Sequence, residues 1–365
     1  MKRLKWFTAA ISLALVAPTA AFADSAFYGL LRSRDLTPFG SLRLDMRPAH
    51  AVAIQPGTWV VETELGYQNT WALSREVETY LTNLESQGRR DLGPDDLQAI
   101  RDLPGENYLL DLEAALLDVT FHYKFSQDWT GYLIVSAVDY SGGFLDGAIE
   151  DFHETFGFSS YGRPAVSRND VNLIFDLNSA DVALFGSPVN SGFMDPTLGV
   201  RYVGLDFSEN WKLALEAAVK VPVGGKRLLL STGHADYGAQ AYLRRRGVRN
   251  AFHVALAAVY YAGAEVPVPH DEQVIPTLIL GYEFRATERT NINLQAYVSE
   301  SVYSRNQTDL DELTAEKYQL SLGVRHRRNG FLFSFGITEN LQNYNNTPDI
   351  GFQLGIAYFP DGALR

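Results

Sequence analysis

Residues 211–221 read WKLALEAAVKV, and their side chains alternate between an apolar set and a mostly polar or small set. The segments 291–299 (NINLQAYVS), 317–327 (KYQLSLGVRHR) and 350–358 (IGFQLGIAY) repeat the pattern. Because successive side chains of a strand point to opposite faces, each segment predicts a strand with one apolar face. A soluble β-sandwich and a membrane β-barrel both show this alternation, so turn spacing and aromatic placement have to separate them.

The first 23 residues have the features of a secretory signal peptide. Three basic residues precede an apolar stretch, 7–17, and residues 21–23 (AFA) fit an A-x-A cleavage site. We therefore treat 1–23 as a signal peptide and expect cleavage after Ala23. No later segment has the roughly 18 uninterrupted apolar residues of a transmembrane helix, so strands are the candidate spanning elements.

The composition argues against several classes of partner and site. The formal net charge of −12 becomes about −15 when Lys2, Arg3 and Lys5 leave with the signal peptide, so nucleic acid is an improbable partner. The chain has no cysteine and can form neither disulfides nor thiolate metal sites. We expect no cofactor and no bound metal.

Short and long connections alternate along the chain, as they do in bacterial outer-membrane barrels, where periplasmic turns are short and outer loops are long. In two short turns, 125–129 and 207–211, a Phe and a Trp flank the polar residues, which suits a membrane–water boundary. The short links are 126–128, 208–210, 247–250, 286–290 and 329–330, and the longer ones are 73–107, 142–168, 222–236, 263–273, 304–316 and 339–349. This rhythm favours a barrel over a sandwich.

We predict an all-β, transmembrane, antiparallel up-and-down β-barrel over 57–359, with a C-terminal tail, 360–365. A hairpin formed by 171–177 and 182–185 either joins the wall or forms an outer flap, and its short turn favours the wall and fourteen strands over twelve. Both counts are even and keep the chain ends in the periplasm. The twelve wall strands expected are 57–72, 108–125, 129–141, 197–206, 211–222, 236–247, 251–262, 274–286, 290–303, 317–328, 330–339 and 350–359.

The first strand carries two tryptophans on one face, Trp59 and Trp71. At about 3.3 Å per residue and a tilt near 40°, they would lie roughly 30 Å apart along the barrel axis, close to the height of the apolar band between two aromatic girdles. We expect one in each girdle. The opposite face carries Glu62 and Glu64, which are hard to place against lipid and therefore belong in the lumen.

A barrel of this size has a lumen that its own strand side chains do not fill. The segment 24–56 is a candidate constriction, a basic arm whose arginines can bond lumen acids. The alternative is a periplasmic tail without fixed structure. For the arginine clusters near the periplasmic strand ends, a ladder against lumen acids is favoured over a filter for anionic solutes. The lumen and constriction candidates are Arg43, Arg47, His50, Glu62, Glu64, Lys212, Glu216, Lys220, Arg244, Arg246, Arg325 and Arg327.

The segment 144–157 (FLDGAIEDFHETFG) predicts a short amphipathic helix in an outer loop, because apolar residues recur at helical spacing and Gly157 can end it. Asp146, Glu150 and His153 form one polar stripe along this helix. Such a stripe could bind a divalent ion or hold a general base. The solvated face of an amphipathic helix is the favoured interpretation.

The segment 141–157 fits the motif SGGFLDxxIExFHxxFG and is followed by Gly162-Arg163. With the segment 194–202 (MDPTLGVRY), it resembles an uncharacterised family of proteobacterial outer-membrane β-barrel proteins of unknown function. The likeness covers most of the mature chain. The second segment departs from the family pattern, since Phe193 and Met194 replace small residues and Arg201 stands for lysine. The resemblance implies the outer membrane of the bacterial cell and a barrel architecture, and it implies no activity.

Three functions remain open. The leading hypothesis is a narrow or gated passive channel for a small solute. The second is an envelope structural or interaction protein that acts through its outer loops. The third is a lipid-modifying hydrolase, for which Ser231, His234 and Asp236 are the nearest candidate set. The expected partners are outer-membrane lipid, lipopolysaccharide, a small solute and, during biogenesis, the barrel-assembly machinery.

Overall fold

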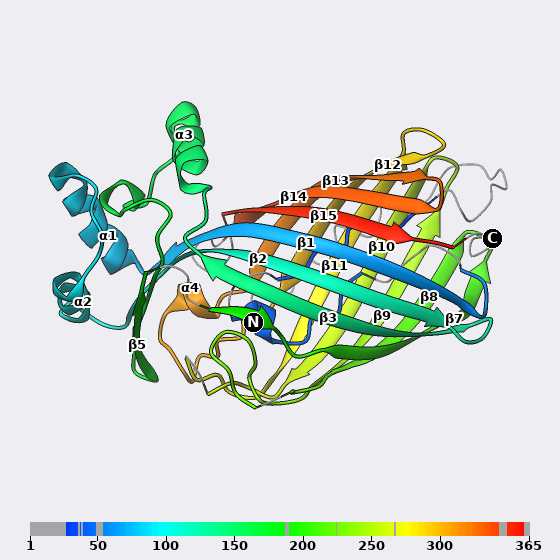
Figure 1. The fold of residues 1–365 in the computed structure, drawn as a ribbon, viewed down its shortest axis with the longest axis horizontal. Helices are drawn as coiled ribbons and strands as arrows, with labels where there is room; N and C mark the ends of the chain where they lie inside the picture. The colour runs from blue at the N-terminus through cyan, green and yellow to red at the C-terminus, as the bar shows by residue number, and fades with distance from the viewer. Residues whose placement is uncertain are drawn as a thin grey trace, which may run out of the picture.

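In a computed structural model of the chain, the wall is one antiparallel sheet closed into a ring of twelve strands (Figure 1). The structure describes residues 27–35, 37, 39–48, 54–186, 190–223, 225–265, 268–342 and 349–360. Each strand pairs with its neighbour along the ring, and the last strand closes it by pairing 350–358 with 61–69 of the first. The predicted barrel is confirmed. The ring strands are β1 (Thr58–Leu73), β2 (Asn107–Lys124), β3 (Trp129–Ser141), β7 (Thr197–Ser208), β8 (Trp211–Lys220), β9 (Asp236–Arg246), β10 (Asn250–Tyr261), β11 (Gln273–Arg285), β12 (Thr290–Ser299), β13 (Lys317–Arg328), β14 (Phe331–Gln342) and β15 (Ile350–Tyr358).

The preference for fourteen wall strands is wrong. The hairpin of β4 (Asn172–Leu177) and β5 (Ala180–Phe185) pairs only with residues 107–111 of β2, beyond the ring. The ladder between β1 and β15 ends at Asn69 and Ile350, whereas β1 and β2 stay paired up to Leu73 and Leu109. These projecting ends offer an edge outside the ring, and the hairpin adds to it. We call residues 70–73, 107–112 and 172–185 the outer flap. A short strand, β6 (Asn190–Phe193), pairs with the outer end of β3.

The long loops gather at one end of the barrel, and Figure 1 shows their helices opposite the C-terminus. The predicted loop helix is α3, and Gly157 caps it at a positive φ of 74°. None of the helices in the described residues has the length and apolarity needed to cross a bilayer. The helices are η2 (Gly40–Leu42), α1 (Arg75–Leu84), η3 (Glu85–Gln87), α2 (Pro94–Arg101), α3 (Asp146–Phe156), η4 (Arg163–Ala165) and α4 (Asp311–Thr314).

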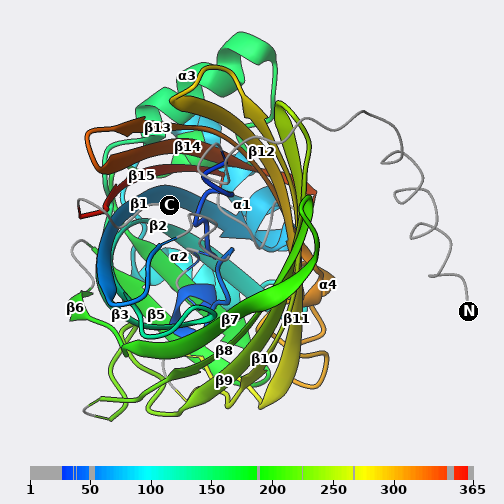
Figure 2. The ribbon, with the colours of Figure 1, turned by 90° about the vertical axis from the view of Figure 1, so that its right-hand side faces the viewer.

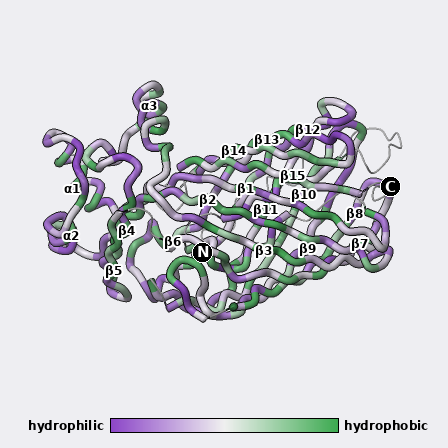
Figure 3. The backbone as a smooth tube through the Cα atoms, in the orientation of Figure 1, coloured by the Kyte–Doolittle hydropathy of each residue, from purple (hydrophilic) through white to green (hydrophobic). Residues whose placement is uncertain are grey.

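The alternation in the sequence becomes the two faces of the wall, and Figure 3 shows hydrophobic and hydrophilic residues alternating along the strands. In β12 the inner side chains from Asn291 to Ser299 are at most 2 % exposed, whereas the outer Leu294 is 44 % exposed. The aromatic residues of the two matching short turns are all exposed: Phe125, Trp129, Phe207 and Trp211. Polar side chains therefore line the lumen, and apolar side chains face outward.

The prediction that Trp71 belongs to an exposed aromatic girdle is wrong. Trp59 is exposed as expected, but Trp71 is only 4 % exposed. Its Nε1 donates to the carbonyl of Tyr161 at 3.0 Å, and the Arg163 guanidinium lies 4.8 Å from its ring centroid. Because β1 continues past the ring into the outer flap, the outer face of β1 is covered there by loop residues of α1 and α2 rather than by lipid.

Candidate functional site

The arm, residues 27–48, lies inside the ring, as the view along the barrel axis shows (Figure 2). Tyr28 lies at the short-turn end, where its hydroxyl is 3.5 Å from the carbonyl of Glu288. The chain rises to Phe39 among the outer loops, turns through η2 and descends to Arg47 beside Glu64. The described arm residues are buried except for the half-buried Ser33 and Arg34. The described arm thus runs from the short-turn end to the outer loops and turns back to the middle of the lumen.

Wall side chains bond the backbone at the start of the arm. Glu283 of β11 accepts the N–H of Tyr28 at 2.6 Å and that of Gly29 at 3.2 Å. Arg325 of β13, a predicted lumen residue, donates through Nη1 to the carbonyls of Tyr28 at 2.6 Å and Leu30 at 3.0 Å. A buried irregular segment needs partners for its peptide groups, and here wall side chains supply them in place of a strand ladder.

The descending limb of the arm is held in the same way near the outer end. Lys220 of β8 donates to the carbonyl of Leu42 at 2.6 Å. Asp236 of β9 accepts the N–H of Leu44 at 2.9 Å, and its carboxylate lies 2.8 Å from the Lys220 ammonium. The wall lysine and the wall aspartate, which lie on neighbouring strands, therefore bind a carbonyl and an N–H group of the same arm segment.

Arginines of the arm meet carboxylates of the wall. The Nε of Arg32 lies 3.6 Å from Glu62. Arg47 bridges two carboxylates, 3.5 Å from Glu64 and 2.9 Å from Asp118. All five side chains are buried, so their ion pairs are little screened by solvent. Two of the predicted lumen residues, Arg47 and Glu64, thus meet directly, and Glu62 pairs with Arg32 instead.

Asp118 was missed by reasoning from the sequence, although a signal existed. It lies in register opposite Glu64 on the neighbouring strand, and two like charges directly opposite each other are destabilising unless a cation lies between them. Arg43, by contrast, contacts neither predicted glutamate. Its Nη2 donates to the Tyr297 hydroxyl at 2.6 Å, and its Nη1 lies 3.5 Å from Asp45 of the arm itself.

The remaining lumen candidates do not converge on one place. Glu216 is buried and lies 2.6 Å from the Nε of Arg201, and Arg244 is buried on the inner face of β9. Lys212, Arg246 and Arg327 are only partly buried and lie toward the short-turn end, where Lys212 is 3.5 Å from Asp206 and Arg246 donates to the carbonyl of Glu209 at 3.2 Å. His50 lies outside the described residues.

The wall has glycines where apolar arm residues pack. A methyl group added at Gly281 would lie 2.2 Å from Leu30 Cδ2, and one added at Gly336 would lie 2.6 Å from Leu31 Cδ1. Both distances are too short for two carbon atoms, so the missing side chains are what admits the arm. Glycine within a strand often marks the close approach of another backbone or ligand, which is the signal that the sequence carried.

A narrow crevice remains between the arm and the wall on the side of β13, β14, β15, β1 and β2. Its volume is about 30 Å³. A single water needs about 10–15 Å³ of such volume, so the crevice has room for only a few waters. Its lining includes the charged residues Arg32, Arg34, Glu64 and Asp118, together with Gly66 and Gly351, which have no side chain to fill it. A solute larger than a few waters would not fit in this crevice unless the arm moved.

The outer flap covers the mouth of the barrel with an apolar layer, which we call the lid. Its inner face, with Leu173 and Phe175, belongs to one buried cluster with loop residues such as Tyr303. Phe39, at the tip of the arm, enters this layer, with its ring centroid 5.3 Å from that of Phe175 and 5.5 Å from that of His270. Burial lowers the pKa of His270 to about 3. The lumen is therefore filled by the arm and capped by the lid.

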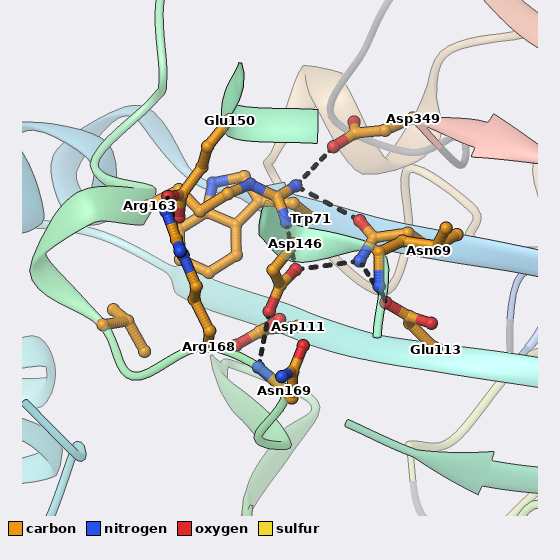
Figure 4. A network of polar contacts seen from close by, with 12 residues as sticks. Asn69, Trp71, Asp111, Glu113, Asp146, Glu150, Arg163, Arg168, Asn169 and Asp349 are labelled. Atoms are coloured by element: carbon orange, nitrogen blue, oxygen red, sulfur yellow. Dashed lines mark hydrogen bonds and ion pairs between the residues drawn. The ribbon is translucent and has the colours of Figure 1, made fainter. Parts of the chain in front are cut away.

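The polar stripe of α3 is fixed by the loops around it (Figure 4). Asp146, which is 4 % exposed, accepts Nη1 of Arg163 at 2.6 Å, Nδ2 of Asn69 at 3.1 Å and the N–H of Asn169 at 2.7 Å. Arg163 also bonds Asp349, and burial raises the pKa of that carboxyl. The first member of the stripe is thus buried in an ion-pair network rather than solvated.

The other two members of the stripe have different surroundings. Glu150 receives two bonds of 2.8 Å from Nη2 of Arg89, and Arg168 Nε donates to it at 3.0 Å. The His153 ring packs 6.0 Å from that of Phe158. Arginines therefore neutralise the carboxylates that would otherwise be available to bind a metal ion. Within the described residues, no group of three His, Cys, Asp or Glu is placed to hold a metal.

The candidate hydrolase residues do not form a relay. Ser231 Oγ donates to Asp195 at 2.7 Å, and His234 Nδ1 lies 3.4 Å from the carbonyl of Gly263. Asp236 is engaged by the arm and by a wall lysine, as described above. A nucleophile needs its base within about 3.2 Å and an acid to orient that base, and the bonds made by these side chains lead elsewhere.

Comparison with known proteins gives a family and a fold. Residues 104–359 match the family described as "Protein of unknown function (DUF3187)". No curated protein matches the chain. Among solved structures, the COG4313 outer membrane channel from Pseudomonas putida F1 has a TM-score of 0.50 at 10 % identity, over 86 % of this chain and 99 % of that chain. The P. putida toluene transporter TodX has a TM-score of 0.42 at 9 % identity, over 84 % of this chain and 91 % of that one. The first likeness shows the fold, a β-barrel like that of an outer membrane channel.

Proposed function

The chain belongs to this DUF3187 family, and within its outer-membrane barrel we propose that the arm closes a gated passive channel for a small solute. The observation that supports a gate is the arm in the lumen, which leaves a crevice of only about 30 Å³ beside it. A barrel built only as a rigid scaffold has no need of a segment whose peptide groups are bonded by charged wall residues. A channel needs a lumen that can be opened, and a polar, exchangeable filling provides one.

The contacts of the arm suit reversible release. Beside the apolar packing of Leu30 and Leu31, the arm makes hydrogen bonds and ion pairs between side chains of the wall and its own peptide groups or arginines. Each hydrogen bond contributes about 1 kcal/mol net, because water replaces it when the pair separates. A lumen lined with Asn, Gln, Glu and Arg can be hydrated, so the empty channel would not expose a continuous apolar surface.

A disulfide lock between arm and wall tests this proposal. The position of a Cβ at Gly281 is 3.0 Å from Leu30 Cγ, which puts the Cβ atoms of Leu30→Cys and Gly281→Cys within about 4.5 Å, as a disulfide requires. The chain has no cysteine of its own, so no other bridge can form. In liposome-swelling assays with small sugars and amino acids, we expect the oxidised double variant to block solute entry and the reduced form to restore it.

The wild-type chain and the single variant Leu30→Cys, treated with the same oxidant, serve as controls and should keep the same flux. Equal flux in the oxidised and reduced double variant would refute the arm as the gate. A barrel that stays impermeable with the arm deleted would refute the channel itself.

The remaining expectations become parts of the proposal. We propose that the arm spans residues 24–56 and that segment 141–157 is a signature of the family. No catalytic role is proposed. Outer-membrane lipid and lipopolysaccharide would surround the wall, and the barrel-assembly machinery would insert it. A second role, interaction through the outer loops, is favoured by one observation: the aromatic residues of α3 and its flanks, which are taken up next.

A further inference from the structure

Four phenylalanines in and beside α3 are exposed. Phe144 is 68 % exposed, Phe152 52 %, Phe156 63 % and Phe158 57 %. The last three form one patch, with ring centroids 4.7 Å apart for Phe152 and Phe156 and 5.9 Å apart for Phe152 and Phe158. A contiguous aromatic patch on an outer loop marks a contact with another surface, because scattered single residues do not stack in this way.

The position of α3 relative to the barrel is the second observation. In Figure 1 the helix stands at the loop end and runs across the barrel axis rather than along it, and in Figure 2 it lies outside the outline of the ring. The barrel axis crosses the membrane, so α3 runs roughly parallel to the membrane plane and overhangs the wall. An amphipathic helix in this orientation is the geometry of an interfacial membrane contact.

The direction of the patch follows from the residues that hold the helix. Glu150 is bound by Arg89 and Arg168, which belong to the loops of the outer cap. Phe152 is two residues further along the helix, which turns it by about 200°, away from that cap. The acidic residues Asp151 and Glu154 lie on the other flank and are exposed.

The segment just before α3 contacts the lipid-facing wall. Phe144, just before α3, stacks on Tyr67 with ring centroids 5.0 Å apart. Tyr67 is on the outer face of β1, the same face as the exposed Leu65. Glu113 accepts the N–H groups of Phe144 and Leu145 at 3.0 and 2.6 Å and so fixes the start of the helix above the wall.

From this placement we propose that the patch of Phe152, Phe156 and Phe158 is inserted in the interface of the outer leaflet, where α3 acts as a lateral anchor of the barrel on lipid. Aromatic rings prefer this boundary, and the acidic flank would remain in water. The ion-pair mount around Asp146 holds the helix in this position. The anchor does not depend on whether the barrel conducts a solute.

Site-directed spin labelling tests the proposal in the cysteine-free chain. Nitroxides at Phe156→Cys, Glu154→Cys and Leu65→Cys are compared in vesicles with a lipopolysaccharide-containing outer leaflet. Leu65 is the lipid reference on the wall, and Glu154 is the water reference on the opposite flank of the helix. We expect higher collision rates with oxygen than with a nickel chelate at positions 65 and 156, and the reverse at position 154.

Two results would overturn the anchor. A label at position 156 that collides preferentially with the nickel chelate would place the patch in water. A label accessible to neither reagent would place it against protein, for example a second copy of the chain. Heat-modifiable migration of each labelled barrel confirms that the wall is folded before the spectra are compared.

Discussion

The arm and the lid both obstruct the same lumen, but different forces hold them. The arm is held by directional contacts, such as Arg325 to the carbonyls of Tyr28 and Leu30, and Arg47 between two carboxylates. The lid is a layer of apolar and aromatic side chains around Phe39 and Phe175. Hydrophobic contact is non-directional, whereas hydrogen bonds and ion pairs fix position. We therefore expect the arm to determine the position at which the lumen is closed, and the lid to limit the rate at which the outer end of the lumen opens.

Removing the arm is the strongest way to break this comparison. Deletion of 27–48 takes away the residues that fill the lumen, while the strand pairing of the ring remains. We expect the largest effect here: in planar bilayers, the intermittent single-channel openings of the wild type should give way to a steady open level. A deleted barrel that still does not conduct would count against the channel itself, as stated above.

Breaking one charged contact of the arm should have an intermediate effect. Arg47→Met keeps most of the side-chain length but leaves Glu64 and Asp118 facing each other in register. Leaving buried charges without their partner costs about 3–5 kcal/mol, so the arm should leave the lumen far more often. The measurement is the fraction of time a single channel is open.

Lys212→Met is the matched control for Arg47→Met. This substitution also removes one positive charge. The pair of Lys212 with Asp206 is only partly buried, however, and contributes little to stability. We expect its open fraction to equal that of the wild type. Equal effects from both variants would show that net lumen charge, rather than the bridge made by Arg47, controls the arm.

Acid should loosen the lid, with the smallest effect of the three. His270 in the closed lid has a pKa of about 3, below the ordinary value of about 6.5, because it is buried among Tyr261, Tyr303 and Phe39 and faces the positive Lys317. The open lid therefore binds one more proton between these values. The closed lid loses stability as pH falls through this window, by at most about tenfold in population per pH unit.

Solute flux through the wild-type protein at pH 7 and pH 5 measures this effect, with His270→Phe as the control. The variant keeps a ring in the aromatic layer but cannot take up a proton. We expect flux to rise at pH 5 in the wild type and to stay level in the variant. A rise of the same size in both would assign the pH response to another group.

The sequence indicated the wall in some detail. Alternation with a period of two assigned Glu62 and Glu64 to the lumen, and the turn rhythm ordered the strands as a barrel. Glycines such as Gly281 and Gly336 were a local signal that the sequence interpretation did not use: a strand position without a side chain often marks the close approach of another segment. The basic composition of the arm pointed to acidic partners, and Arg32 and Arg47 have them.

The partners themselves needed the tertiary structure. Trp71 repeats the pattern of Trp59, yet it is buried because β1 continues into the flap. Glu150 lies in the predicted polar stripe, but its hydrogen-bond donors Arg89 and Arg168 come from loops 61 and 18 residues away along the chain.

By itself the sequence determined which face of each strand is polar and that the strands close into a membrane barrel, because both follow from the local two-residue period and from turn length. Only the tertiary structure decided that the ring has twelve strands, that the arm occupies it and that α3 overhangs it. These depend on strand register and on contacts between residues far apart in the chain, which no local pattern records.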